Sequence, residues 1–326
     1  MAALATQLNI CGIPVQIRGE WDELRRAIAH DFTAFCTEEG ACAEADSLEV
    51  ELNQASHRRG WTPLLKTQRS TLFISPLDER RVCFFDQVAV RYRYAQRKAQ
   101  IWSMQTEAAF EALYYVLLSY VGERLDEQGW HRLHGFGFSG KRRAVVLASS
   151  GTGKSTLAWS LLQNSGFYFY SDDTPLINRS GEMSAFPQRI ALEQLPAGVH
   201  GRAFKRARNK TKYVLESESF CDRVGKTGRL QDIYGLIKTT PEEGIAPAPR
   251  HQFLVPLLKW LVLGYETPQI WELYLRLSPR DILSKVGILR SRLRAAHRLF
   301  WHTKHYIIGR DSEKKTAEWL VAHARG

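Results

Sequence analysis

An apolar run that leads through a glycine-bearing loop into a helix constrains the fold of this chain more than any other feature. Val145 to Ala148 has the character of a buried strand, and a loop from Ser149 to Thr156 follows it directly. Helical spacing then continues from Ser155 to Leu162. A strand, a tight loop and a helix in this order are typical of α/β proteins, so we expect an α/β fold with this loop beside a sheet.

The loop contains the residue types that bind the phosphates of a nucleotide. Gly151 and Gly153 allow successive backbone N–H groups to turn toward phosphate oxygens, Lys154 reaches the terminal phosphate, and the helix dipole favours an anion. The pattern G-x-x-x-x-G-K-[ST] has a glycine where this chain has Ala148, so one position departs from it. A glycine- and serine-rich turn without a ligand is the alternative. The expected nucleotide-binding residues are Ser149, Ser150, Gly151, Thr152, Gly153, Lys154, Ser155 and Thr156.

Two adjacent aspartates follow the next apolar segment. Gly166 ends the helix, Phe167 to Ser171 is typical of a central strand buried on both faces, and Asp172 and Asp173 come directly after it. Carboxylates at the carboxyl end of a buried parallel strand lie where open α/β sheets bind ligands. One carboxylate can hold Mg²⁺ while the other accepts a proton from an attacking hydroxyl. A Ser-Asp-Asp turn that caps the next element is the alternative interpretation.

The order of these motifs resembles a known family. His134-Gly135, a strand, the loop from Ser150 to Ser155, a helix, and an apolar strand ending in Asp172-Asp173 are similar to the catalytic domain of bacterial HPr serine kinase/phosphorylase. They are still more similar to the broad set of HPr-kinase-related proteins, and the resemblance is strong from about Trp130 to Ile177. It implies a P-loop nucleotide-binding core of the HPr-kinase-like type, with ATP and Mg²⁺ as cofactors.

The resemblance also implies roles for individual residues. Asp172 would be the general base for the acceptor hydroxyl, and His134 would lie at the active site. Asp173 would belong to the metal and nucleotide environment. Apart from the resemblance, the chemistry of phosphoryl transfer predicts that Lys154 aligns the phosphates, which makes it a third expected catalytic residue.

A weaker part of the resemblance lies further along the chain. Pro187 to Glu193 is similar to the family's strand after the aspartate pair, which makes Glu193 an expected Mg²⁺ ligand beside Ser155 and Asp173. Leu195 to Gly201 only approximates the family's glycine-rich signature, and this departure counts against phosphorylase activity and against HPr as the acceptor. The expected acceptor is therefore a serine-bearing peptide or protein, or a small hydroxylated metabolite.

Together the motifs predict an ATP-dependent kinase that transfers the γ-phosphoryl group to a hydroxyl group. One alternative is a P-loop NTPase without an acceptor, which would need a glutamate or glutamine to position water. The adjacent aspartates, without an obvious arginine finger, disfavour it. The other alternative is an ATP-binding regulatory protein with reduced turnover, which Ala148 and the approximate glycine signature leave open.

Net charge points to anionic partners. The chain carries 45 Lys and Arg against 34 Asp and Glu, a formal charge of +11. Basic runs raise encounter rates with anions, but these runs lack the aromatic platforms and groove-reading motifs of nucleic-acid binders, so nucleic acid is not expected. We expect one basic segment to neutralise ATP or an anionic acceptor, with a solvated basic face as the alternative. Its residues are Arg202, Lys205, Arg206, Arg208, Lys210 and Lys212.

Cysteine usage and hydropathy predict a cytoplasmic protein. The longest apolar run, Phe253 to Tyr265, is broken by Pro256 and Lys259 and is too short to span a bilayer, and no basic-then-apolar signal region begins the sequence. The five cysteines are scattered without the paired spacing of a zinc site or a disulfide framework, which indicates a reducing compartment. They are Cys11, Cys36, Cys42, Cys83 and Cys221.

The chain is expected to divide into two domains. Residues 1–128 form an α+β module that positions the acceptor or contacts a partner chain, with a hairpin turn at Asp86-Gln87 and a helix from Glu107 to Leu125. Residues 129–326 form the HPr-kinase-like catalytic domain with a helical C-terminal part that could make contacts in a homo-oligomer. The elements expected there are helices over His251–Leu263, Asp281–Phe300 and Ser312–His323, and a strand over Lys304–Ile308.

Overall fold

Two units, each assembled from separate stretches of the chain, make up the mixed α/β structure. The first comprises Met1–Arg124, Glu193–Val214 and Pro268–Leu283, and the second comprises Leu125–Leu192, Leu215–Thr267 and Ser284–Gly326. The first unit thus includes two later segments that the sequence-based division assigns to the catalytic domain. The predicted division into domains of residues 1–128 and 129–326 therefore stays a prediction.

The computed structural model describes most of the chain. The described residues are 5–35, 47–56, 60–68, 70–196, 198–205, 211–215, 220–237, 244–274, 276, 278–309 and 313–325. Within these ranges it contains seven α-helices and several sheets, which confirms the α/β class. No described helix combines the length and the apolar character needed to cross a bilayer.

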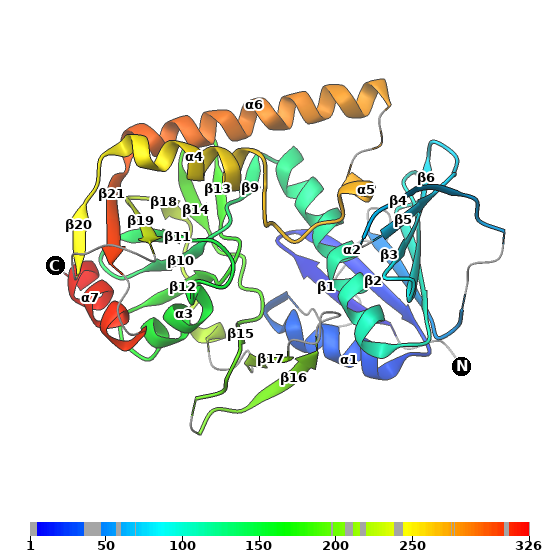
Figure 1. Cartoon of the computed structure of the whole chain (residues 1–326), viewed down its shortest axis with the longest axis horizontal. Coiled ribbons are helices and arrows are strands. Elements are labelled where there is room, and N and C mark those ends of the chain that lie inside the picture. The colour runs from blue at the N-terminus through cyan, green and yellow to red at the C-terminus, as the bar shows by residue number, and fades with distance from the viewer. Residues whose placement is uncertain are drawn as a thin grey trace. The chain divides into compact units, whose positions relative to one another are not determined.

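An eight-stranded sheet forms most of the first unit (Figure 1). The central strands β2, β3 and β8 run parallel to one another, and the other neighbours pair antiparallel. Leu48, Val50 and Leu52 alternate with half-buried residues along β3, which is the period of a strand with one face on a core. In spatial order the strands are β1 (Thr6–Ile10), β2 (Ile13–Gly19), β3 (Leu48–Asn53), β8 (Lys98–Ser103), β7 (Val88–Arg93), β6 (Glu79–Phe84), β5 (Ser70–Phe73) and β4 (Pro63–Lys66).

The hairpin predicted in this sheet is confirmed. Strands β6 and β7 pair with Phe84 opposite Val88, and the Gln87 amide donates to the Phe84 carbonyl at 2.9 Å. Phe85 and Asp86 have φ values of 50° and 56°, so the left-handed residues of the turn lie one position before the predicted pair Asp86-Gln87.

Helix α2 (Thr106–Glu127) confirms the helix predicted from Glu107 to Leu125. Most of this helix is buried, which explains why its apolar residues are not confined to one face. The other helical segments of the first unit are α1 (Asp22–Asp31), the 3₁₀ turn Thr33–Phe35 and α5 (Trp271–Tyr274).

A six-stranded sheet forms the centre of the second unit. Strands β11, β19 and β21 are parallel neighbours, while β10 is antiparallel to both β11 and β12. Strands β11 and β12 therefore point the same way and end at the same edge of the sheet. In spatial order the strands are β12 (Tyr168–Ser171), β10 (Phe136–Ser139), β11 (Arg143–Leu147), β19 (Asp232–Ile237), β21 (Lys304–Gly309) and β20 (Ile245–Pro247).

The prediction that Phe167 to Ser171 forms a central parallel strand is wrong. Strand β12 is the outermost strand of the sheet and pairs antiparallel with β10. The strand is apolar for another reason, because successive side chains are buried in different hydrophobic clusters on opposite faces of the sheet. Phe169 packs against Phe136 and Phe220, whereas Tyr170 belongs to the core on the opposite face. An edge strand buried on both faces has the same sequence pattern as a central one.

Helices cover both faces of the six-stranded sheet (Figure 1). Helices α3 (Lys154–Leu162) and α7 (Glu313–Arg325) pack together on one face, where the Tyr234 hydroxyl of β19 lies 2.9 Å from Nδ1 of His323. On the other face, α4 (Leu254–Leu257) and α6 (Pro279–His302) share a core with β11 and β19.

The helix predicted over His251–Leu263 is confirmed as helical but changes type along its length. A 3₁₀ turn (Arg250–Phe253) leads into α4, and a π-helix (Leu258–Val262) follows. Pro256 lacks an N–H donor, so a regular α-helical ladder cannot run through this segment. Helix α6, strand β21 and helix α7 confirm the remaining elements predicted for the C-terminal part.

A second, smaller sheet of the second unit contains four strands. Its β13 (Leu176–Asn178) pairs with β9 (Trp130–Arg132) and with β14 (Glu182–Ser184), and β18 (Gly228–Arg229) lies at the edge. The strand predicted from Pro187 to Glu193 is reduced to the two residues of β15 (Ala191–Leu192). The remaining elements are β16 (Gly201–Lys205), β17 (Thr211–Leu215) and the 3₁₀ turn Cys221–Arg223.

Candidate functional site

One edge of the six-stranded sheet brings together three segments that the sequence singled out. The loop from Ser149 to Thr156 follows β11, the pair Asp172-Asp173 follows β12, and His134 precedes β10, which runs in the opposite direction between them. The Gly135 amide donates to the Asp173 carbonyl at 3.0 Å, so a backbone hydrogen bond joins the residue before β10 to the turn after β12. The topology alone thus places these residues side by side.

The loop has the backbone conformation that its glycines permit. Gly151 and Gly153 have φ values of 78° and 92°, which a residue with a Cβ rarely adopts, and Gly153 is the N-cap of α3. The Thr152 hydroxyl donates to the Ser149 carbonyl at 2.7 Å and closes the turn. Ala148 is not among the residues with positive φ, so the backbone does not require a glycine there.

Lys154 is buried at the base of the loop and contacts His134. Its Nζ donates to the Ala148 carbonyl at 2.6 Å and lies 2.6 Å from Nε2 of His134. Lys154 is 6% exposed and His134 is 1% exposed, so burial holds the lysine against the imidazole at the base of the loop.

The two aspartates differ in their surroundings. Asp172 is 7% exposed, whereas the Asp173 side chain is 44% exposed. Oδ1 of Asp173 lies 3.1 Å from Nδ1 of His134, at hydrogen-bond distance but without the alignment of a hydrogen bond. The Ser171 hydroxyl accepts the Thr174 amide at 3.1 Å, so the turn that the sequence allowed as an alternative is also present.

The structure adds Glu266, which the sequence analysis missed. Its Oε2 accepts the Ser150 amide at 2.9 Å and the Ser150 hydroxyl at 3.1 Å, and it lies 3.1 Å from Nε2 of His134. Its Oε1 lies 3.6 Å from Nζ of Lys259. Burial raises the pKa of Glu266, but the bonds from Ser150 and the nearby His134 and Lys259 outweigh it and lower the pKa below its ordinary value.

The π-helix contains Lys259 and precedes the turn that carries Glu266. Within this segment the Trp260 ring lies 6.0 Å from the His134 ring, and the His134 amide approaches the Trp260 carbonyl at 3.4 Å. Short π-helical segments are frequent at functional sites. Nothing local in the sequence marks Glu266, because 116 residues separate it from Ser150.

The expected metal ligands are only partly brought together. Ser155 lies in the first turn of α3 and Asp173 at the same sheet edge, both in the second unit. Glu193 belongs to the first unit, so its assignment stays a prediction. Within the described ranges, no group of three or more His, Cys, Asp or Glu side chains could hold a metal ion. Magnesium sites at nucleotides commonly use one or two protein ligands together with phosphate and water, so this donor set is compatible with Mg²⁺.

His131, the other histidine near the loop in sequence, has a structural role. Its Nδ1 lies 2.7 Å from Oδ1 of Asp126, and its Nε2 lies 2.8 Å from the Ser291 hydroxyl. Arg292 donates to both Asp126 oxygens, at 3.0 and 2.6 Å, and to the Val262 carbonyl at 3.1 Å. This buried network connects α2 and α6 to the end of the π-helix.

The basic segment is described only in part. Arg202 donates to Asp31 at 2.8 Å and lies over the Phe110 ring at 4.9 Å, so this arginine has a packing role within the first unit. Arg206, Arg208 and Lys210 lie outside the described residues, as do Cys36 and Cys42. The role of the segment in binding ATP or an acceptor stays a prediction.

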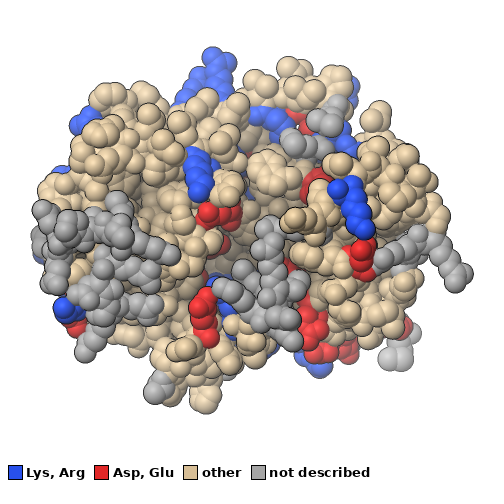
Figure 2. Space-filling model, viewed as in Figure 1, with Lys and Arg blue, Asp and Glu red and all other residues tan. Residues whose placement is uncertain are grey.

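Charged side chains of both signs occur on the face shown in Figure 2. The coloured atoms of this face show acidic and basic groups next to each other in several places, separated by wide areas of uncharged residues. The excess of positive charge is therefore not gathered into one continuous patch among the described residues of this face.

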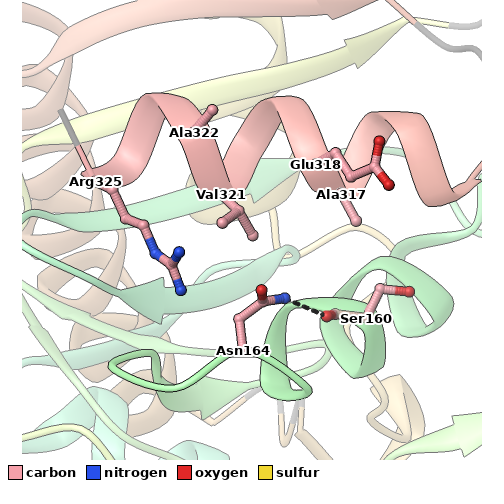
Figure 3. Close-up of a pocket in the computed structure, with 7 residues that line it drawn as sticks. All are labelled: Ser160, Asn164, Ala317, Glu318, Val321, Ala322 and Arg325. Carbon is pink, nitrogen blue, oxygen red and sulfur yellow. Dashed lines mark hydrogen bonds between the residues drawn. The ribbon is translucent and has the colours of Figure 1, made fainter.

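A solvent-open hollow of about 590 Å³ lies between α3 and α7, and no loop residue lines it (Figure 3). Arg325 extends from α7 toward α3, and small or apolar residues of α7 form much of the wall. The lining residues are Ser160, Asn164, Ala317, Glu318, Val321, Ala322 and Arg325. None of the motifs found in the sequence lines this hollow.

No protein-family model matches the chain, and no curated protein is significantly similar to it in sequence. The residues of the site are therefore the basis on which a function can be proposed.

Proposed function

We propose that this protein is an ATP-dependent kinase with a P-loop core of the HPr-kinase-like type. It would transfer the γ-phosphoryl group of ATP to a hydroxyl of a peptide or protein serine, or of a small hydroxylated metabolite. One observation carries the proposal: the loop after β11, the aspartates after β12 and His134 before β10 meet at one sheet edge. Ligands of α/β sheets bind at such edges.

The loop suits an anionic ligand. An anionic oxygen, that of Glu266, already accepts the Ser150 amide and hydroxyl, which indicates that these donors are directed at a site fit for negative charge. Gly151 and Gly153 supply the backbone conformation, and the N-terminus of α3 adds a favourable dipole. Ser155 and Asp173 would hold Mg²⁺. ATP with Mg²⁺ supplies the transferable phosphoryl group and charge neutralisation.

Each residue around the loop would have a separate role in phosphoryl transfer. Lys154 orients the phosphates and stabilises charge that develops on them. Asp172 accepts the proton of the acceptor hydroxyl as its oxygen forms the new bond to phosphorus. His134 contacts Lys154 through Nε2 and faces Asp173 through Nδ1, and so positions the lysine and the carboxylate relative to each other.

Hydrolysis of ATP without an acceptor is the second candidate function. It would need a glutamate or glutamine to position water, and Glu266 is a glutamate beside the loop. Against it, the Glu266 carboxylate is bonded to the Ser150 donors themselves, which places it where a phosphate oxygen would bind rather than where an attacking water would stand.

A single-turnover assay separates the candidates. The protein is mixed with γ-labelled ATP and Mg²⁺, with or without a pool of serine-containing peptides or a pool of sugars, and the label is followed. Label on a peptide or sugar supports the kinase, and label released as phosphate supports hydrolysis. ATP that binds but keeps its label indicates a regulatory protein. A kinase role would be ruled out by release of all label as phosphate at a rate that no acceptor changes.

A further inference from the structure

Glu266 places a carboxylate directly on the donors of the phosphate-binding loop. Its Oε2 accepts both the amide and the hydroxyl of Ser150, at 2.9 and 3.1 Å, while Lys259 approaches the other oxygen at 3.6 Å. The carboxylate thus receives two donors from one loop residue and faces a cation. A phosphate oxygen bound at this loop would use the same donors.

The segment that carries Glu266 is a turn with an unusual backbone. Glu266 has a φ of 62°, a conformation that residues with a side chain rarely adopt, and Gly264 has a φ of 64°. The Tyr265 amide donates to the Lys259 carbonyl at 3.0 Å, and the Thr267 amide donates to the Gly264 carbonyl at 3.2 Å. The backbone is therefore held in a shape that presents this one side chain to the loop.

The charge of Glu266 is retained at neutral pH. The Ser150 hydrogen bonds and the neighbouring His134 and Lys259 lower the pKa of its carboxyl below the ordinary value, although burial acts in the opposite direction. An ionised carboxylate and a nucleotide phosphate are both anions, so they cannot share the Ser150 amide without repulsion.

We propose that Glu266 is an internal competitor of the nucleotide: its carboxylate binds the Ser150 donors and has to leave them before a di- or triphosphate can bind. The inference rests on the proposed nucleotide site and adds a gating step to it. The side chain would set the affinity of the loop for phosphate, and any event that draws Glu266 toward Lys259 would open the loop.

The test compares four proteins by calorimetry, each titrated with pyrophosphate and with ATP and Mg²⁺. They are the wild type, Glu266→Gln, Glu266→Gly and the control Glu318→Gln. Glycine suits the left-handed backbone at 266, and the Gln variant keeps the side-chain size. The control removes one negative charge from Glu318, an exposed residue of α7 that lines a hollow with no loop residue in its wall. Thermal unfolding of all four establishes that they are folded.

We expect both Glu266 variants to bind pyrophosphate and ATP about tenfold more tightly than the wild type, because a charge-assisted bond no longer opposes the ligand. The control should bind like the wild type. Equal or weaker binding in both variants would overturn the inference. So would unchanged affinity with loss of turnover in Glu266→Gln, which would identify a water-positioning base.

The same experiment separates this inference from the proposed kinase activity. If the Glu266 variants bind pyrophosphate more tightly but no protein transfers label from ATP, competition by Glu266 stands and the kinase proposal falls. If label is transferred to an acceptor but all four proteins bind pyrophosphate equally, the kinase proposal stands and the competitor role falls.

Discussion

The buried ion pair between Asp126 and Arg292 provides a quantitative prediction for this structure. Both side chains are almost fully inaccessible, at 1% and 6% exposure, and both Asp126 oxygens accept bonds from Arg292. Asp126→Asn would leave a buried guanidinium without its counter-charge. Removing one partner of a buried pair costs about 3–5 kcal/mol, so we expect the free energy of unfolding to fall by that amount.

Part of this loss depends on pH. Burial raises the pKa of Asp126, but Arg292 and the His131 hydrogen bond outweigh it and lower the pKa from 3.8 to about 2. A carboxyl with a lowered folded-state pKa stabilises the fold above its unfolded pKa and loses that contribution as pH falls through the folded value. The difference corresponds to about 2 kcal/mol. The wild type should lose this stability between about pH 4 and pH 2, whereas Asp126→Asn should not.

Urea unfolding at pH 7 and at several acid pH values measures both effects. Asp232→Asn is a matched control, because Arg142 also donates to both oxygens of Asp232, at 2.6 and 2.8 Å, but is 36% exposed. Water can hydrate Arg142 after the substitution, so the expected loss is only about 1 kcal/mol. Equal losses in the two variants, or a loss below about 1 kcal/mol for Asp126→Asn, would refute the reasoning from burial.

Three further predictions concern the loop and its neighbours. Lys154→Ala should lower the rate of phosphoryl transfer by at least about 100-fold, since the cation stabilises charge on the phosphates; a single-turnover rate above a tenth of the wild-type rate would contradict this. Asp172→Asn should keep ATP binding but lose transfer, whereas Asp173→Asn should weaken the Mg²⁺ dependence of nucleotide binding; calorimetry with and without Mg²⁺ would refute the assignment if both variants lost affinity equally. His134→Phe should reduce transfer through misplacement of Lys154, so adding it to Lys154→Ala should cost little more; additive losses in the double mutant would show that the two act independently.

Local features of the chain were predictable from the sequence because short-range sterics and hydrophobic periodicity determine them. The step from β11 through two glycines into α3, the hairpin of β6 and β7, and the apolar spacing of α6 each follow from contiguous residues. The position of the aspartates beside the loop was predicted from strand ends, whereas the position of His134 there was predicted only through the family resemblance. In the structure, the directions of β10, β11 and β12 explain why these three segments lie at one sheet edge.

Other features depended on contacts between distant residues, which a local pattern does not encode. The apolar run of β12 indicates burial on two faces, but only the pairing with β10 decides that it is an antiparallel edge strand. In the sequence, Glu266 is a single acidic residue that follows an interrupted apolar run. In the structure, the π-helix lies beside His134, and the Glu266 carboxylate in the turn after it accepts hydrogen bonds from Ser150. A residue acquires such a role from the partners that folding places beside it, so the sequence determined the loop, and the tertiary structure decided what occupies it.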